Sequence, residues 1–223
     1  MKNRIFFVLN KLEDFNFLDL LRKYLPDFAC DLGECFPPEP AVYALVVLWN
    51  YEKIVADLPE PNNVVVFHGS DLPEGRGWAP IYYAIAEGQP EYCITGFLAA
   101  SKVDRGDVIV KARFPLKTEY TASDLRRFDT EISIRLVREI VRRFSGSTIT
   151  GSPQQGEGTY RARRRPADNE LAADKTLLEL MPLLRAAEDR HPAFFKHAGK
   201  TFRVRIEAEQ PAEFPEHVEI VFP

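Results

Sequence analysis

The chain has 223 residues, of which 45% are hydrophobic and 28% charged, and its net charge is −4 at pH 7. A chain of this length can bury one sizeable hydrophobic core, alone or together with a small appendage. The slightly acidic balance argues against the broad basic surface that nucleic-acid binding requires, so we expect no nucleic-acid partner.

Cysteine content and the lengths of apolar runs indicate the cellular compartment. The cysteines are odd in number (Cys30, Cys35 and Cys93) and form no Cys-x-x-Cys pair, which is typical of a reduced protein. The first apolar run, Ile5–Leu9, is too short for a signal peptide, and no run approaches the length of a membrane span. We therefore expect a cytoplasmic protein with no membrane partner.

In the first half of the chain, apolar runs alternate with helical patterns. Continuous apolar runs are typical of buried strands, and they occur at Ile5–Leu9, Tyr43–Trp49 and Val64–Phe67. Leucines at helical spacing predict a helix over Phe17–Tyr24, which a proline ends. A loop rich in glycine and proline follows the third strand, and a short helix is predicted over Ile81–Ala86.

The second half begins with two further predicted strands, Tyr92–Leu98 and Asp107–Ala112. Apolar residues then recur at helical spacing across Ala122–Phe144, which predicts a long amphipathic helix with Ser123 as its N-cap. After a polar, glycine-rich stretch we predict one helix and two strands that pair with each other, namely Asp174–Ala187, Thr201–Ala208 and Val218–Phe222.

This order of elements predicts an α/β fold with a mostly parallel sheet. Between the first two strands there is room for one helix and little else, and no Gly-x-Gly-x-x-Gly motif follows the first strand. Both observations disfavour NAD binding. We interpret residues 1–150 as the main domain and residues 151–223 as a small C-terminal α+β subdomain, with 145–158 as the linker.

Two residues with catalytic chemistry stand at strand ends. His68 directly follows a buried strand and heads the glycine-rich loop, and ligands of open α/β sheets bind beyond the carboxyl ends of strands. A lone histidine in such a loop is more often simply solvated. Asp104 lies in an Asp-Arg-Gly-Asp turn, where a carboxylate is ordinary turn chemistry. Neither residue identifies a catalytic site by itself.

The wider pattern around these residues resembles the folate-dependent formyltransferase superfamily. The stretch FHGSDLPEGRGWAPIYYAIAEGQ contains His68, and VDRGDVIVK contains Asp104. They are similar to the family's strand ending in Asn-x-His, its Ser-Leu-Leu-Pro loop and its Asp-x-Gly-Asp turn. The later segment HPAFFKHAGKTFRVRI resembles the nucleotide-sugar N-formyltransferases of this superfamily. The resemblance covers Tyr43 to Ile206.

The resemblance implies a truncated Rossmann-like formyltransferase fold and a specific reaction. The chain is expected to move a formyl group from 10-formyltetrahydrofolate to the amine of a nucleotide-linked amino sugar, with His68 and Asp104 as the catalytic pair. In such a pair the carboxylate orients the histidine and raises its basicity, and the histidine accepts the amine proton. The resemblance implies no metal, and because relatives of this type are often dimers, a homodimer is one expectation.

The resemblance also implies which residues surround the pair. The folate should lie between two loops, whose residues are Trp49, Asn50, Tyr51, Ile54, Ser101, Lys102 and Val103. The amine substrate should contact Ser70, Asp71, Arg76, Gly77, Trp78, Tyr82, Gln154 and Tyr160. Trp49 and Tyr51 are of a type more often found in the core, and Trp78 and Tyr82 fit stacking on a base and packing onto the sheet equally well.

A dense basic cluster consists of Arg161, Arg163, Arg164 and Arg165. Such a cluster can bind a diphosphate or RNA through charge-assisted hydrogen bonds. It is more often a solvated loop face, and a solvated face is our expectation here.

The sequence departs from the family pattern at a polar position. The asparagine two residues before the histidine is Val66 here, and Asp71 replaces an apolar loop residue. Loss of the asparagine removes a donor to the oxyanion, so a backbone amide, Ser70 or a bound water must replace it, and Asp71 can supply part of the lost polarity. Two alternatives stay open. One is a formyltransferase for another small amine, and the other is a folate- or sugar-nucleotide-binding homologue with impaired catalysis.

Overall fold

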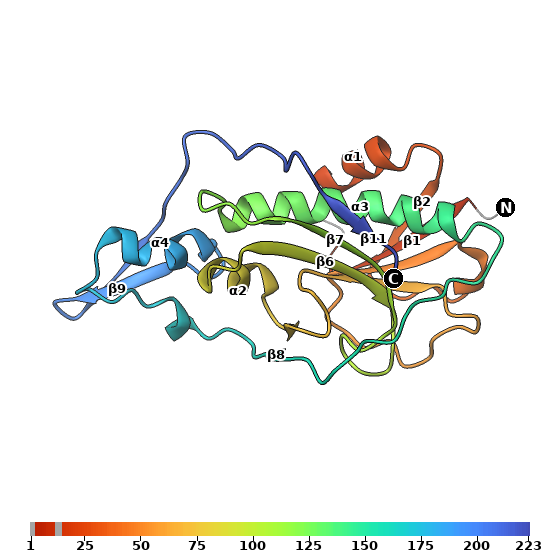
Figure 1. Ribbon diagram of the computed structural model, residues 1–223, viewed down its shortest axis with the longest axis horizontal. Coiled ribbons are helices and arrows are strands. Elements are labelled where there is room, and N and C mark those ends of the chain that lie inside the picture. Colours follow the sequence, from red (N-terminus) through yellow and green to blue (C-terminus); the bar gives the residue numbers. More distant parts are fainter. Residues whose placement is uncertain (1–2, 12–14) are drawn as a thin grey trace.

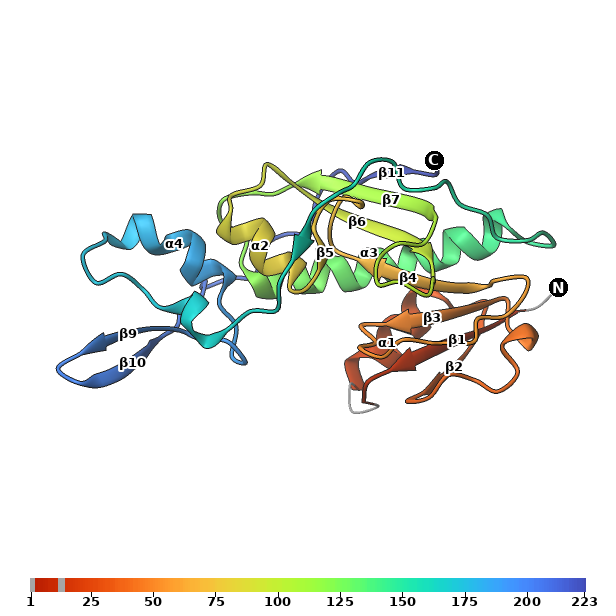
Figure 2. The same cartoon turned by 90° about the horizontal axis from the view of Figure 1, so that it is seen from below.

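The computed structural model describes residues 3–11 and 15–223. Within these residues the main body is a seven-stranded β-sheet (Figures 1 and 2). From edge to edge its strands are β2 (Ala29–Gly33), β1 (Arg4–Leu9), β3 (Leu45–Trp49), β4 (Val64–His68), β6 (Glu91–Leu98), β7 (Val108–Pro115) and β11 (Glu219–Val221). The three continuous apolar runs became β1, β3 and β4, as predicted for buried strands.

The sheet changes its pairing at β4. The strands from β2 to β4 pair in parallel, whereas β4–β6, β6–β7 and β7–β11 pair antiparallel. Because β4 and β7 both run opposite to β6, they share a direction with the parallel strands, and the mostly parallel sheet is confirmed. The sequence did not predict β2, because its residues lie at the sheet edge, are only partly buried and form no continuous apolar run.

The helices are α1 (Phe15–Tyr24), α2 (Pro80–Ala86), α3 (Ala122–Arg143) and α4 (Leu177–Ala186), with 3-10 turns η1 (Pro40–Val42) and η2 (Pro166–Asn169). The long amphipathic helix is confirmed as α3, which shares the main core with α1. Its N-cap is Thr121, so the prediction of Ser123 was wrong. Thr121 is preferred because Asp124 stands three residues later, and the two side chains cap each other's backbone N–H groups.

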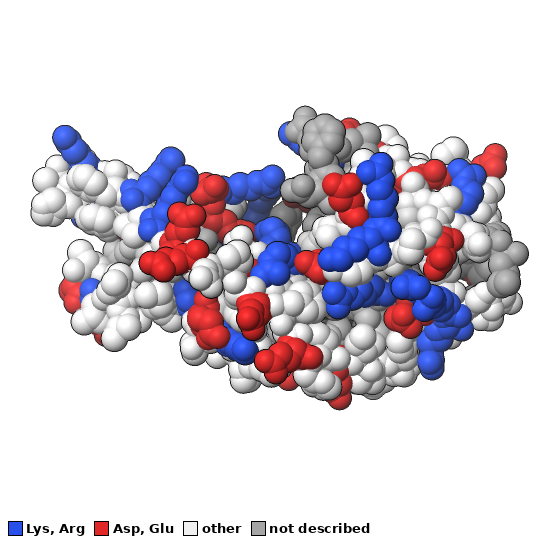
Figure 3. Space-filling model, turned by 90° about the horizontal axis from the view of Figure 1, so that it is seen from above, with Lys and Arg blue, Asp and Glu red and all other residues white. Residues whose placement is uncertain are grey.

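Loops cover the other face of the parallel strands, where Tyr51 and Leu58 pack on Val46 and Val64. The face of the molecule seen from above carries basic and acidic side chains side by side (Figure 3). Ion pairs in the described part of the chain include Arg138 with Asp27. Among the described residues no helix is long and apolar enough to span a membrane.

The C-terminal part of the chain divides its strands between two sheets. The predicted strands over 201–208 and 218–222 do not pair, and that prediction was wrong. β10 (Lys200–Val204) instead forms a hairpin with β9 (Ala193–His197), because Ala198 and Gly199 adopt the positive φ angles of a tight turn. β11 joins the edge of the main sheet. The division into residues 1–150 and 151–223 stays a prediction.

We call η2, α4, β9 and β10 the C-terminal lobe. These elements share a small apolar cluster built on Leu171, Leu184 and Ala193. The hairpin of the lobe projects from the main body (Figure 2). Before the chain reaches the lobe, β8 (Tyr160–Arg161) pairs in parallel with β5 (Arg76–Gly77) and thereby ties the polar stretch to the glycine-rich loop.

Candidate active site

His68 and Asp104 face each other at the carboxyl end of β4. His68 is the last residue of that strand, and Asp104 lies in the turn between β6 and β7. Imidazole Nδ1 and carboxylate Oδ2 are 3.9 Å apart, and the two side chains are only 10% and 11% exposed. This separation is too long for a direct hydrogen bond but leaves the two groups a shared gap. The fold thus brings together the two residues that the sequence motifs single out.

The glycine-rich loop holds both members of this pair. His68 Nε2 lies 2.9 Å from the carbonyl oxygen of Gly75. A carbonyl only accepts hydrogen bonds, so Nε2 carries a proton, and Nδ1 is the ring nitrogen that faces Asp104. The backbone N–H of Gly77 donates to Asp104 Oδ2 at 2.8 Å. One short segment of chain therefore sets the orientation of both side chains.

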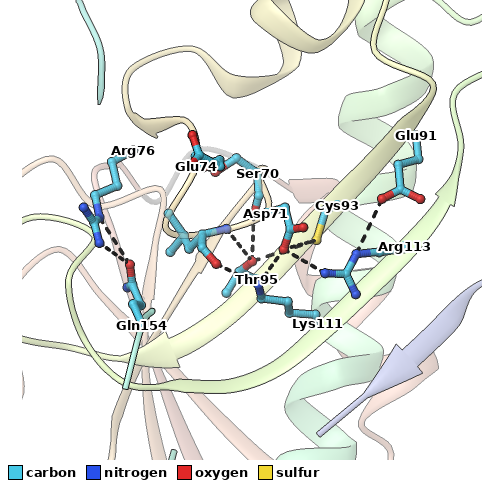
Figure 4. A network of polar contacts seen from close by, with 11 residues as sticks. Ser70, Asp71, Glu74, Arg76, Glu91, Cys93, Thr95, Lys111, Arg113 and Gln154 are labelled. Atoms are coloured by element: carbon cyan, nitrogen blue, oxygen red, sulfur yellow. Dashed lines mark hydrogen bonds and ion pairs between the residues drawn. The ribbon is translucent and has the colours of Figure 1, made fainter. Parts of the chain in front are cut away.

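The turn that carries Asp104 is held by Arg76 and Gln154. The buried Arg76 guanidinium donates to Gln154 Oε1 at 2.6 Å (Figure 4). It also donates to the Asp104 carbonyl at 3.1 Å. Gln154 Nε2 donates to the carbonyls of Asp104 and Gly106. Burial and the neighbouring Arg105 lower the pKa of Arg76. Both predicted substrate-binding side chains are thus engaged in organising the catalytic turn.

Gly106 allows this turn to cross close to β6. A Cβ atom at this position would lie 1.6 Å from the carbonyl oxygen of Leu98. Real Cβ atoms do not approach backbone oxygen so closely, so a side chain here would displace the turn. The requirement for glycine explains the Asp-Arg-Gly-Asp sequence better than general turn chemistry does.

A cavity of about 390 Å³ lies beside the turn that carries Asp104, and neither His68 nor Asp104 is among its lining residues. It is lined by Ile54, Arg76, Ser101, Lys102, Val103, Arg105, Glu157, Gly158, Thr159 and Tyr160. The structure therefore brings together four of the residues predicted for folate and two predicted for substrate. Ile54 and Val103 are apolar and more than half exposed, so they offer uncovered apolar surface at this cavity.

Three residues predicted to bind folate lie outside the cavity lining. Trp49 packs against Phe17 in the main core, with ring centroids 4.9 Å apart. Tyr51 packs into the apolar cluster on the other face. The Asn50 carbonyl accepts a hydrogen bond from the Asn10 side chain. The aromatic side chains at 49 and 51 therefore stabilise the fold, which is the more frequent role of such residues.

The loop residues predicted to bind the amine make local contacts. The Ser70 hydroxyl donates to the Glu74 carbonyl at 2.7 Å. Asp71 forms ion pairs with Lys111 and Arg113, an arrangement that sequence patterns did not indicate. The family asparagine position, Val66, is paired with apolar residues on both sides and carries no polar atom.

The basic cluster is a solvated loop face only in part, because Arg163 and Arg165 are exposed whereas Arg164 is buried. Arg163 stacks on Trp78 with its guanidinium carbon 4.6 Å from the ring centroid, and the buried Arg164 stacks on Tyr82 at 3.5 Å. Burial lowers the pKa of Arg164 and raises that of Tyr82. A second cavity of about 690 Å³ lies here, lined by Tyr82, Tyr83, Ala162, Arg163, Arg165 and Asp168. The expectation of a solvated face therefore holds for Arg163 and Arg165 and is wrong for Arg164, which is buried against a tyrosine far away in sequence.

Sequence reasoning also missed a buried pair beneath the loop. The hydroxyl of Tyr92 donates to Asp129 at 2.7 Å, and burial raises the pKa of both groups. A Cβ atom at Gly69 would lie 2.0 Å from that hydroxyl, so the pair supports the backbone directly after His68. Among the described residues no cluster of histidine, cysteine and carboxylate ligands could hold a metal ion.

Comparison with known proteins identifies the family. Residues 41–138, which include both members of the pair, match the family model described as formyl transferase. The chain is 30% identical over 162 residues to a methionyl-tRNA formyltransferase from Koribacter versatilis, covering 70% of this chain and 52% of that relative. This chain spans between 52% and 59% of the length of the first three curated relatives, which are all methionyl-tRNA formyltransferases.

Solved structures share the fold at low sequence identity. HypX from Aquifex aeolicus aligns with a TM-score of 0.78 and 18% identity, over 97% of this chain and 42% of that chain. A sugar N-formyltransferase from Shewanella sp FDAARGOS_354 aligns with a TM-score of 0.63 and 17% identity, over 94% of this chain and 99% of that chain. The match over residues 41–138 and the motifs within it identify this segment as a formyl transferase domain, and the solved structures share its fold.

Proposed function

We propose that this chain transfers a formyl group from 10-formyltetrahydrofolate to the amine of a nucleotide-linked amino sugar. The observation that carries the proposal is the His68–Asp104 pair, which lies within the segment matched by the family model and in which Asp104 stands between Val103 and Arg105, two residues that line the 390 Å³ cavity. Support for the donor comes from that family match and from a structural neighbour, HypX, that has been solved in complex with tetrahydrofolic acid.

The geometry suits acyl transfer to nitrogen. A neutral amine attacks the formyl carbon, a carbon–nitrogen bond forms, and the bond from that carbon to the folate nitrogen breaks. His68 Nδ1 takes the amine proton, and Asp104, 3.9 Å away, stabilises the resulting imidazolium. The departing folate nitrogen is protonated as tetrahydrofolate leaves.

The developing oxyanion must rely on backbone amides, bound water or the imidazolium. Val66 offers no polar atom, and the hydroxyl proton of Ser70 is engaged by the Glu74 carbonyl. Removal of one oxyanion donor costs roughly 10²–10³ in rate in well-studied enzymes. We therefore propose a slower chemical step than in relatives that keep the asparagine.

The folate ring is proposed to occupy the 390 Å³ cavity. Ile54 is 65% exposed and Val103 is 55% exposed, and both line it. The faces of a pterin ring placed between them would cover apolar surface that otherwise faces water. Lys102 and Arg105 from the same lining offer positive charge to the carboxylates of the folate tail.

The second cavity supports the proposal that the acceptor carries a nucleotide. Arg163 has no carboxylate partner in the described part of the chain, so its charge is available to a diphosphate. Tyr82 and Tyr83 line the same cavity and offer ring surface to a base. Trp78 follows directly on Gly77, whose backbone contacts Asp104. An extended acceptor can therefore reach from one cavity to the catalytic pair.

The acceptor is tested by comparing four classes of amine with 10-formyltetrahydrofolate as donor. These are nucleotide-linked amino sugars, free amino sugars, amino-acid derivatives and methionyl-tRNA, with release of tetrahydrofolate and mass of the product as readouts. We expect turnover with the first class. Turnover only with another class would overturn the proposed acceptor. Folate binding without transfer to any amine would favour a binding protein that has lost catalysis.

A homodimer is part of the same proposal. The C-terminal lobe exposes Leu177, Leu178 and Phe202, three large apolar side chains that a partner subunit could cover. Sedimentation or light scattering at micromolar concentration is expected to give twice the monomer mass. A monomer at all concentrations would contradict this part of the proposal without affecting the catalytic assignment.

A further inference from the structure

Asp71 stands at the centre of a polar network outside the gap between His68 and Asp104 (Figure 4). Its Oδ1 atom accepts from Lys111 Nζ and, at 2.8 Å, from Arg113. Burial raises the pKa of the Asp71 carboxyl, but the two cations outweigh burial and hold it below its usual value. The neighbouring Cys93 is a neutral thiol, since burial raises its pKa to about 12. Two cations therefore converge on one carboxylate.

The cations that hold Asp71 are aligned with His68 across three strands. His68 on β4 pairs in register with Thr95 on β6, and Thr95 pairs with Lys111 on β7. Directly paired residues of antiparallel strands project from the same face of a sheet. The loop that follows His68 folds back over this row, which brings Asp71 onto Lys111 and Arg113.

Other contacts fasten the same loop to the same row. The buried Thr95 hydroxyl donates to the Ser70 carbonyl at 2.6 Å, and Lys111 also donates to the Leu72 carbonyl at 2.7 Å. Within the loop, the Glu74 N–H donates to the Asp71 carbonyl. Contacts from β6 and β7 thus determine the path of the chain from Ser70 to Glu74.

The next residue along that path touches the catalytic histidine. The carbonyl of Gly75 accepts from His68 Nε2 at 2.9 Å, and two residues later Gly77 contacts Asp104. At its far end this segment is tied to Thr159, whose hydroxyl accepts from the Gly75 N–H. Displacement of the loop at Asp71 would therefore move the group that determines which ring nitrogen of His68 carries the proton.

We propose that Asp71, clamped by Lys111 and Arg113, is a positioning residue that keeps His68 in the Nε2–H tautomer through the Gly75 carbonyl. The inference rests on the proposed function, because it assigns Asp71 a role through the proposed catalytic histidine. It also explains why an acidic residue stands at this loop position. The carboxylate anchors the loop to β7, since both of its cations come from that strand.

The test compares Asp71→Asn with Asp31→Asn in the full chain. Asp31 also forms an ion pair, with Arg4 at 2.6 Å, but it lies on the edge strand β2 away from the pair. We expect kcat of Asp71→Asn to fall roughly 10- to 100-fold, as small displacements in active sites do, with KM for the folate unchanged. Asp31→Asn should behave as the unmodified chain. Arg113→Gln, which keeps Lys111, should give a smaller decrease.

A spectroscopic readout separates positioning from general stabilisation. In ¹⁵N-edited NMR spectra at pH 8, the protein should show a protected His68 Nε2–H proton, assigned by its loss in His68→Gln. This proton should exchange rapidly with water in Asp71→Asn and persist in Asp31→Asn. Persistence of this protected proton in Asp71→Asn, with or without a decrease in kcat, would overturn the proposed role of Asp71. Absence of the protected proton from the unmodified chain would also overturn it.

The proposed role of Asp71 and the proposed function of the chain are contradicted by different results. If the unmodified chain formylates no amine but its protected proton is lost in Asp71→Asn, the clamp stands and the proposed function fails. If Asp71→Asn turns over at the rate of the unmodified chain, the clamp fails and the proposed function stands. Should Asp71→Asn not fold, Arg113→Gln provides both readouts, with the same outcomes deciding.

Discussion

The main sheet and the C-terminal lobe use the same local device to start a helix, in different surroundings. Both α3 and α4 begin with a capping box, formed by Thr121 with Asp124 and by Thr176 with Glu179. Asp124 is 7% exposed and also accepts from the Ala212 N–H, whereas Glu179 lies open to water with Lys175. A local signal therefore starts each helix, while the burial of its cap determines how much the cap contributes to stability.

The two regions also divide the proposed chemistry. The main body supplies His68, at the end of the central strand β4, and Asp104, in the turn between β6 and β7. The segment leading to the lobe supplies the arginines stacked on Trp78 and Tyr82, and α2 packs against α4. Changes in the body should therefore affect the chemical step, and changes in the lobe should affect stability locally.

The largest effect is expected at the catalytic pair. His68→Ala and Asp104→Asn should each reduce kcat/KM for formyl transfer by about 10²–10⁴, the usual contribution of general acid–base catalysis. Asp107→Asn is a matched control, because Asp107 lies in the same turn with an exposed side chain. Release of tetrahydrofolate measures the rates. Near-normal turnover in either mutant would show that the pair was assigned wrongly.

The next largest effect is expected from truncation of core side chains, which should distinguish the main body from the C-terminal lobe. Phe128→Ala removes a fully buried ring from the main core and should lower the free energy of unfolding by about 3–5 kcal/mol. Leu184→Ala lies in the small cluster of the lobe, so we expect faster amide hydrogen exchange in α4, β9 and β10 with little change in the sheet. Equal acceleration of exchange throughout the molecule would mean that the lobe and body unfold as one unit.

Gly106→Ala should have an intermediate effect confined to the catalytic turn. The new methyl group would collide with the Leu98 carbonyl, and we expect a loss of about 1–3 kcal/mol with a large decrease in activity. Gly146→Ala is the control, because its Cβ would meet open space and only its positive φ of 80° is unfavourable. Denaturant titration and turnover measure both effects. Equal behaviour of the two variants would refute the close-approach argument.

The smallest expected effect is a pH dependence at the α3 capping box. Burial raises the pKa of Asp124, but hydrogen bonds from Thr121 and Ala212 outweigh it and lower that pKa below 3.8. The carboxylate therefore contributes stability above pH 3.8, and this contribution is lost as the pH falls through the lowered value. Asp124→Asn should cost about 1 kcal/mol at pH 7, and the difference should shrink below pH 3.8. A difference that is constant down to pH 2 would contradict this account.

Several elements could be predicted from sequence because their signals are local. The runs of β1, β3 and β4 are apolar at every position, and α3 repeats its apolar residues over 22 residues. The strand β2 was not predicted, because this short edge strand carries little apolar pattern, and β11 was predicted as a strand with the wrong partner, because its partner β7 lies far along the chain. The N-cap of α3 also has a local signal, because Asp124 stands three residues after Thr121 and completes a capping box that favours Thr121 over Ser123.

The sequence by itself determined the fold class, the position of His68 at the end of a buried strand and the family motifs around Asp104. Only the tertiary structure decided that the two residues lie 3.9 Å apart, that His68 Nε2 meets the Gly75 carbonyl, and that Asp71 meets Lys111 and Arg113. The physical reason is the separation along the chain between the residues that interact. Apolar periodicity reports which residues are buried, whereas ion pairs and hydrogen bonds across strands depend on where distant segments meet.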